Sequence, residues 1–266
     1  MMNKNTYQKV ALQKGEMHIY DFGAIRLHAY QTHDPLEDEV FILEKAGRAV
    51  LIEAPCFTDN ERELTDYLQR QNLLVDGMLL AYHMAGAAFL PEAKKYATPN
   101  AEEYGHQGGG RALIDQFQNA FGDCFDSSIH LVTCHLTEGP VTIGGIDFII
   151  TTTPDAFDIE IPEINAVYTH MLGHDCHSIV AGPGHADAII AQLKMFMQKG
   201  YSLILTSHYT PEDLKDAQTK IDYLEQVKAI AAQSQDASAF KQSVRAAYPQ
   251  YSGDNYLEMT AGFFFA

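Results

Sequence analysis

The stretch LLAYHMAGAAFLP (residues 79–91) joins the end of an apolar run to a turn of small residues. Tyr82 and His83 end the run, and no further polar side chain follows until Glu92. A polar group that directly follows a buried strand lies where open α/β folds build their sites. His83 is therefore a candidate site residue, and the segment VDGMLLAYH (75–83) is a predicted buried strand.

Strand-like and helical patterns continue on both sides of this stretch. Alternating or continuous apolar runs predict strands over 25–31, 39–45, 48–54, 93–99, 129–136, 140–153, 164–170 and 201–208. Helical spacing and end signals predict helices over 58–73, 110–122 and 185–198, and a long helix opened by Thr210-Pro211. Two halves of mixed strand and helix content predict an α/β fold with helices outside two sheets.

The composition excludes several classes of partner. The 266 residues carry 18 Lys and Arg against 35 Asp and Glu, a formal net charge of -17. Because this charge repels phosphate backbones and anionic lipid, we expect no nucleic acid and no membrane as partners. No signal peptide and no apolar run of about 20 residues is present, so we expect a soluble, cytoplasmic protein. The four scattered cysteines predict free thiols.

Two other segments also place polar groups directly after predicted strands. The first is THMLGHDCHSIVAGPGH (169–185), which contains His170, His174, Asp175 and His177. The second is Ser207-His208-Tyr209 at the end of the strand over 201–208. Imidazole and carboxylate groups in such loops are candidate ligands of zinc, iron or nickel.

The series LIEAP (51–55), LLAYHMAGAAFLP (79–91), DFIITTTPDAFDIEIPEINAVYTHMLG (147–173) and LILTSHYTPEDL (203–214) resembles the metallo-β-lactamase superfamily in order and spacing. The resemblance covers about residues 15–235 and implies a four-layer αβ/βα sandwich. It places the site at the sheet edges between the two halves. We therefore expect one domain over 1–266, with a C-terminal extension over 236–266.

The resemblance assigns positions in this chain to the metal ligands of the superfamily. His83 matches the first histidine of the H-x-H-x-D-H motif, and His208 matches the final histidine. Other ligand positions carry different residues: Ala85, Ala87 and Ala88 in the same motif, Asp155 near the third histidine, and Met171 at the bridging aspartate. Glu53 stands where the superfamily has a structural aspartate.

The loss of these ligands makes two-metal hydrolysis improbable, because one imidazole per metal cannot hold a zinc ion tightly. One hypothesis is a descendant without cofactor that binds a small molecule or a partner in the pocket between the sheets. The alternative is a hydrolase with a rebuilt site for one zinc or other divalent transition metal. Its predicted ligands are His83, His208, His170, His174 and His177, with Asp155 or Asp175 as a ligand or general base.

The apolar ending MTAGFFFA (259–266) contrasts with the polar residues before it. It predicts a docked terminal strand or segment, or else the contact of a homo-oligomer.

Overall fold

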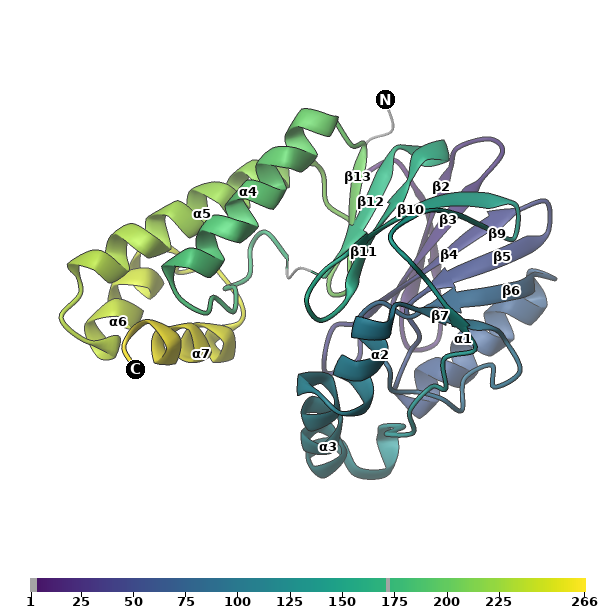
Figure 1. Ribbon diagram of the computed structural model, residues 1–266, viewed down its shortest axis with the longest axis horizontal. Helices are drawn as coiled ribbons and strands as arrows, with labels where there is room; N and C mark the ends of the chain where they lie inside the picture. Colours follow the sequence, from purple (N-terminus) through teal and green to yellow (C-terminus); the bar gives the residue numbers. More distant parts are fainter. Residues whose placement is uncertain (1–3, 171–172) are drawn as a thin grey trace. The chain divides into compact units, whose positions relative to one another are not determined.

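The computed structural model describes residues 4–170 and 173–266, and the chain divides into two compact units (Figure 1). The first unit holds the described residues up to 170 together with Ile204–Pro211, and the second holds residues 173–203 and Glu212–Ala266. Each unit has buried apolar side chains of its own, such as Phe148 in the first and Leu224 in the second.

The larger sheet of the first unit has eight strands in sequence order. They are β1 (Gln8–Ala11), β2 (Glu16–Asp21), β3 (Arg26–Gln31), β4 (Glu39–Lys45), β5 (Arg48–Ile52), β6 (Leu74–Leu79), β7 (Lys95–Ala97) and β8 (Cys134–His135). Neighbours from β1 to β5 are antiparallel, and those from β5 to β8 are parallel. The predicted strands over 25–31, 39–45, 48–54, 75–83 and 93–99 lie here, whereas β1 and β2 were not predicted.

Two connections in this sheet differ in length. Ala46 and Gly47 both have positive φ and join β4 to β5 by a tight two-residue turn, the geometry that suits a twisted hairpin. The connection from β3 to β4 spans residues 32–38 and is held by its own hydrogen bonds, such as the one from the Thr32 hydroxyl to the Asp38 carbonyl. This longer connection brings Asp38 to the candidate site described below.

The second sheet has five strands in the order β13-β12-β11-β10-β9. They are β9 (Gly139–Ile143), β10 (Ile146–Thr152), β11 (Phe157–Ile161), β12 (Ala166–Thr169) and β13 (Leu203–Thr206). The prediction of one strand over 140–153 is wrong, because Gly144 and Gly145 adopt positive φ and turn the chain back on itself. The short β11 was not predicted as a strand.

The two sheets pack face to face in the first unit, where the rings of Phe41 and Tyr168 meet with centroids 6.1 Å apart. Helix α1 (Thr58–Arg70) lies on the larger sheet, since Tyr67 and Glu63 on α1 bond His28 and Tyr30 on β3. Helices α2 (Pro99–His106) and α3 (Gly109–Phe121) follow β7.

The prediction of a strand over 129–136 is wrong for most of that range, where only β8 is a strand. Ile129 makes a single bridge with Ala85, and the N–H of His130 donates to the Met84 carbonyl. Residues 129 and 130 therefore pair with the loop after His83 and do not add a strand to the sheet.

The second unit contains α4 (Pro183–Lys199), α5 (Leu214–Gln233), α6 (Ala237–Ala247) and α7 (Asp254–Phe264). Helix α5 begins after Asp213 and not at the predicted Thr210-Pro211, because Asp213 accepts from the N–H groups of Lys215 and Asp216. The C-terminal residues form a helix and not a strand, and Phe264 packs on Phe240 of α6, as a docked segment would. Within the described residues, no helix is both long and apolar enough to cross a membrane.

Candidate metal centre

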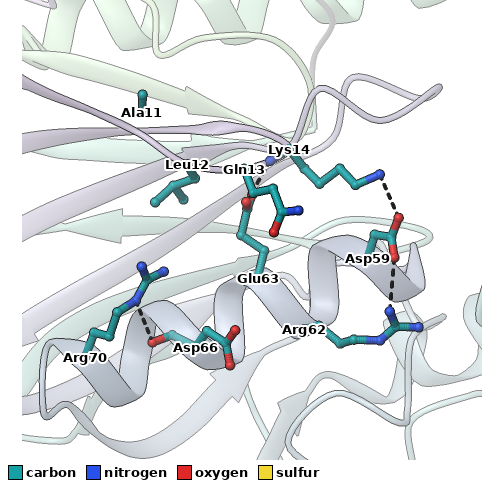
Figure 2. A pocket seen from close by; sticks show the side chains of 9 residues that line it. All are labelled: Ala11, Leu12, Gln13, Lys14, Asp59, Arg62, Glu63, Asp66 and Arg70. Atoms are coloured by element: carbon teal, nitrogen blue, oxygen red, sulfur yellow. Dashed lines mark hydrogen bonds and ion pairs between the residues drawn. The ribbon is translucent and has the colours of Figure 1, made fainter.

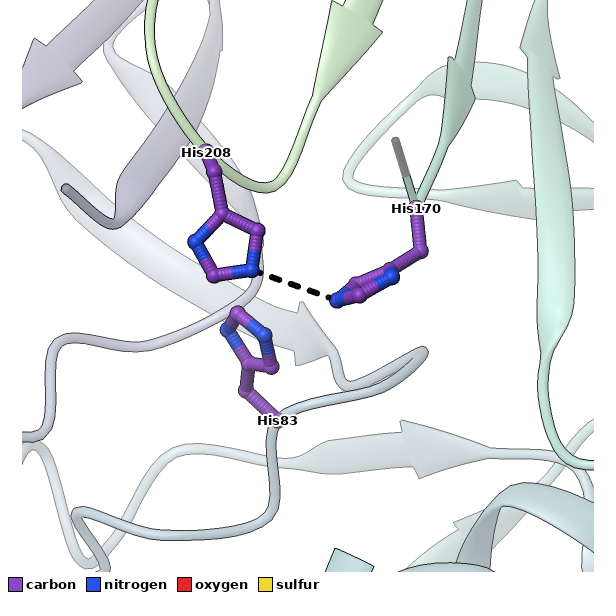
Figure 3. A group of neighbouring side chains, drawn as sticks. All are labelled: His83, His170 and His208. Atoms are coloured by element: carbon purple, nitrogen blue, oxygen red, sulfur yellow. Dashed lines mark hydrogen bonds between the residues drawn. The ribbon is translucent and has the colours of Figure 1, made fainter. Parts of the chain in front are cut away.

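Three histidines meet where strands of the two sheets end (Figure 3). His83 lies in the loop after β6, His170 directly follows β12, and His208 lies two residues after β13. All three side chains are half-buried, and one ligand atom from each lies within 4.8 Å of the others. Nε2 of His170 and Nε2 of His208 are 3.3 Å apart. Among the described residues, this is the set of His, Cys, Asp and Glu side chains that converges closely enough to hold a metal ion.

A buried polar network fixes the backbone that carries the three histidines. Glu53 is fully buried at the end of β5, and its carboxylate accepts from the N–H groups of Tyr82 (2.9 Å) and His83 (3.1 Å). The Tyr168 hydroxyl donates to the same carboxylate and lies 2.6 Å from the Ser207 hydroxyl. Because Tyr168 and Ser207 stand two and one residues before His170 and His208, one network ties all three strand ends together.

His208 has its Nδ1 atom occupied by acceptors. This atom lies 3.1 Å from the Leu36 carbonyl and 3.1 Å from Oδ1 of Asp38. Two acceptors at Nδ1 favour the tautomer that carries its proton there. The Nε2 lone pair of a neutral His208 is then free to face His170 and His83, as in the carboxylate–histidine–metal arrangement of metalloproteins.

His170 is oriented by rings on three sides. Tyr82 stacks on it with ring centroids 4.4 Å apart and an interplanar angle of 27°. His83 and His208 approach it edge-on, with centroid distances of 5.5 and 5.1 Å. These contacts hold the His170 imidazole in one orientation, with Nε2 toward His208.

The pKa values of Asp38, His208 and His170 are shifted in different directions by their surroundings. Burial disfavours the ionised form of Asp38, but the positive charge of His83 and the hydrogen bond to His208 lower the pKa of Asp38 to about 2. Burial opposes protonation of His208, yet its hydrogen bond to Asp38 and that group's charge leave its pKa raised. Burial, with the charges of His208 and His83, holds the pKa of His170 well below its usual value. His170 is therefore neutral near pH 7, which is the form that binds metals.

The other predicted site residues have different surroundings. Asp155 is exposed between β10 and β11. His174, Asp175 and His177 lie in the second unit, and Asp175 is exposed there. Nδ1 of His174 lies 3.1 Å from Glu212, and Nδ1 of buried His177 lies 3.0 Å from the Tyr223 hydroxyl. Of the predicted segment 170–177, His170 is the residue that joins His83 and His208.

The alanines after His83 lie in a loop whose backbone N–H groups are hydrogen-bonded to another segment. The N–H of Gly86 donates to the Asp126 carbonyl, and the N–H of Ala88 donates to the Asp126 carboxylate. Ala85 pairs with Ile129 in an isolated bridge. The loop is thus ordered by Asp126 and supplies no ligand beyond His83. Met171, assigned to the bridging-aspartate position, lies outside the described residues.

Sequence reasoning missed Asp38. Its signal is weak, because the acidic turn HDPLEDE (33–39) is typical of an exposed connection between two strands. Nothing in the sequence pairs this turn with His208, which is contacted by Leu36 from 172 positions earlier in the chain.

The donor set fits one metal ion. Zinc in catalytic sites takes three protein ligands and keeps one open position, and imidazole suits zinc, iron and nickel. Three half-buried histidines, one of them backed by a buried carboxylate, match that requirement. They do not supply the roughly doubled ligand set of a two-metal site.

A hollow of about 530 Å³ lies elsewhere, between the β1–β2 turn and α1 (Figure 2). It is lined by Ala11, Leu12, Gln13, Lys14, Asp59, Arg62, Glu63, Asp66 and Arg70. Lys14 and Arg62 both pair with Asp59, and Glu63 accepts from the N–H groups of Lys14 and Gly15. These charges largely satisfy one another, so the histidine cluster is the stronger candidate site.

No protein-family model matches the chain, and no curated protein matches its sequence. Solved structures do match its fold. A sec-alkylsulfatase from Pseudomonas sp. aligns with a TM-score of 0.64 and 13% identity over 90% of this chain and 48% of its own. This chain therefore spans about half the length of that enzyme.

Two other structures match over most of their own length. A metallo-β-lactamase from Erythrobacter litoralis aligns with a TM-score of 0.57 and 12% identity, covering 82% of this chain and 100% of its own. A metallo-β-lactamase family protein from Thermus thermophilus aligns with a TM-score of 0.58 and 13% identity, covering 91% of each chain. These likenesses confirm the predicted α/β fold of the metallo-β-lactamase type.

Proposed function

We propose that this chain of metallo-β-lactamase fold is a hydrolase that uses one divalent metal ion held by His83, His170 and His208. The observation that carries the proposal is the convergence of three imidazoles, with one ligand atom of each within 4.8 Å of the others. Sequence reasoning alone favoured a descendant without metal. The position of His170 shifts the balance, because it raises the two retained histidines to the three ligands that a catalytic zinc requires.

The ion would supply Lewis acidity, which activates water and polarises the bond to be cleaved. The protein's own groups bind the ion and orient its ligands. Glu53 and Tyr168 hold the backbone at His83 and His170, and Tyr82 packs on the His170 ring.

The reaction class is supported by the similar structures only in a general way. One is named a sulfatase and another a metallo-β-lactamase, and both names denote hydrolysis. Sequence identities of 12–13% support a shared fold but do not identify a substrate. We therefore propose hydrolysis of an ester or amide bond, without a narrower substrate.

Elemental analysis of protein purified without a histidine tag tests the metal site. We expect about one equivalent of zinc or another divalent transition metal per chain, as three protein ligands support. His83→Ala, His170→Ala and His208→Ala should each lose most of that metal, because two imidazoles hold zinc weakly. His135→Ala is the matched control, since His135 is exposed and pairs with Glu102.

Metal-dependent cleavage of a panel of ester and amide substrates tests the activity. Chelation should abolish it, and zinc should restore it. A wild-type chain that takes up no zinc would sink the proposal and return the protein to the metal-free binding hypothesis. In that case a proton shared between His170 and His208 would occupy the centre of the cluster.

A further inference from the structure

We infer that Asp38 is the positioning residue of this metal centre, supplying the buried negative charge that orients His208 and balances the ion. The inference rests on the proposed function, and it assigns a role to a residue from the turn between β3 and β4. The segment after His83, MAGAAFLP (84–91), contains no acidic side chain. The carboxylate of the centre must therefore come from another part of the fold.

The burial of Asp38 requires a positive partner. Its side chain is 3% exposed, and a carboxylate removed from water is costly unless it is paired and hydrogen-bonded. Oδ2 accepts from the Cys56 thiol at 3.3 Å, which is a weak donor. Oδ1 has the His208 imidazole as its neighbour, 3.1 Å away.

The other acidic neighbour of Asp38 does not meet its need for a positive partner. Asp34, 6% exposed in the same turn, accepts from the Asp38 N–H through Oδ1. This second carboxyl supplies no positive charge to Asp38. A cation at the histidines, whether a proton or a metal ion, is what makes an ionised Asp38 stable in this place.

The backbone holds Asp38 against His208. The N–H of Glu39 donates to the Ser207 carbonyl at 2.8 Å, and the N–H of Tyr209 donates to the Glu37 carbonyl at 2.9 Å. Asp38 and His208 themselves form an isolated antiparallel bridge. Two segments far apart in sequence are thus held in register, and Oδ1 of Asp38 lies 3.1 Å from Nδ1 of His208.

This arrangement makes Nε2 of His208 the metal-binding atom. Carboxylates behind a ligating histidine raise its basicity, and their loss weakens metal binding by about 10–100-fold. The geometry separates Asp38 from a merely structural acid, because Asp34 lies in the same turn and binds backbone N–H groups of Leu36 and Asp38.

Zinc affinity of matched variants tests the inference. Asp38→Asn keeps the size of the side chain and an acceptor for Nδ1 but removes the charge. We expect it to raise the zinc dissociation constant by about 10-fold or more, measured by competition with a chromophoric chelator. Glu37→Gln, the control, removes the charge of an exposed side chain in the same turn and should stay close to the wild-type value. The visible spectrum of the cobalt(II) form should show unchanged coordination in both variants.

Cadmium-113 NMR of the wild-type chain gives a second readout that needs no variant to fold. We expect scalar coupling from the bound ion to Nε2 of His208, with Nδ1 still protonated. Coupling to Nδ1, or equal zinc affinity of wild type and Asp38→Asn, overturns the role of Asp38 while the metal site stands. A wild-type chain that binds neither ion overturns the proposed function as well.

Discussion

Glu61 on α1 and Asp126 in the loop before β8 are two carboxyl groups whose charges act on each other. Glu61 is 8% exposed. Burial, with the charge and hydrogen bond of Asp126, raises the pKa of Glu61 to about 8. Hydrogen bonds from Ser128 and from the Ala88 N–H outweigh burial at Asp126 and lower its pKa. Glu61 is therefore mostly protonated at neutral pH, while ionised Asp126 accepts from the Ala88 N–H in the loop after His83.

This pair predicts a pH dependence of stability. The folded pKa of Glu61, about 8, exceeds its usual value of 4.5, so the folded state binds more protons between these pH values. The stabilising contribution is complete below about pH 4.5 and is lost as pH rises through about 8. Glu61→Gln keeps a neutral donor at every pH. We expect the variant to exceed wild type by about 1–2 kcal/mol in the free energy of unfolding near pH 9.

Urea unfolding of both proteins at a series of pH values measures the effect. The two stability curves should diverge as pH rises from about 4.5 to about 8 and run parallel above that range. Parallel curves from pH 5 to 9 would show that Glu61 ionises normally in the folded chain.

At the level of secondary structure, the residues of the candidate site lie just after the ends of strands and not within them. Glu53 directly follows β5, His170 directly follows β12, and Ser207 and His208 follow β13. The hydroxyl of Tyr168 bridges Glu53 and Ser207. A side chain on one strand thereby joins the two sheets at the level where the histidines emerge.

Tyr168→Phe removes this bridge without leaving a cavity. Glu53 and Ser207 are both fully buried, so each loses a partner that water cannot replace. We expect a loss of about 1–3 kcal/mol in the free energy of unfolding, measured by chemical denaturation. Tyr7→Phe, at a 36% exposed position, should cost almost nothing. Equal stability of the two variants would contradict the network.

At the scale of the whole molecule, the first unit is discontinuous in sequence. Its edge strand β13 and His208 come after α4, a helix of the second unit. The C-terminal helix α7 belongs to the second unit, where Phe264 and Phe265 contact Phe240 of α6. Its role as an oligomer contact stays a prediction, with Phe263 still 52% exposed.

A chain that ends after residue 170 should therefore fail to fold, although it contains most of the first unit. It lacks β13, which leaves β12 as an exposed edge prone to intermolecular pairing, and it lacks His208. We expect aggregation or non-cooperative thermal unfolding by circular dichroism and size-exclusion chromatography. A monomeric fragment with a sharp unfolding transition would refute this dependence.

Elements whose signals are local could be predicted from the sequence alone. Apolar alternation located β3 to β6, and the strand-end positions of His83 and His208 marked them as site candidates. The sequence could not decide whether His170, His174 or His177 joins them, since the three are close in sequence and equally suited as ligands. It also missed the Gly144-Gly145 turn, which interrupts a run of otherwise continuous strand character.

The composition of the candidate centre depends on contacts between segments that are distant in the sequence. The ring of His170 is directed by Tyr82 and by its place at the end of β12, while His174 and His177 have partners of their own in the second unit. Asp38 reaches His208 through backbone pairing between segments distant in the chain. Local patterns encode propensity and burial, but convergence of imidazoles and carboxylates depends on how the edges of two sheets pack, which only the folded chain specifies.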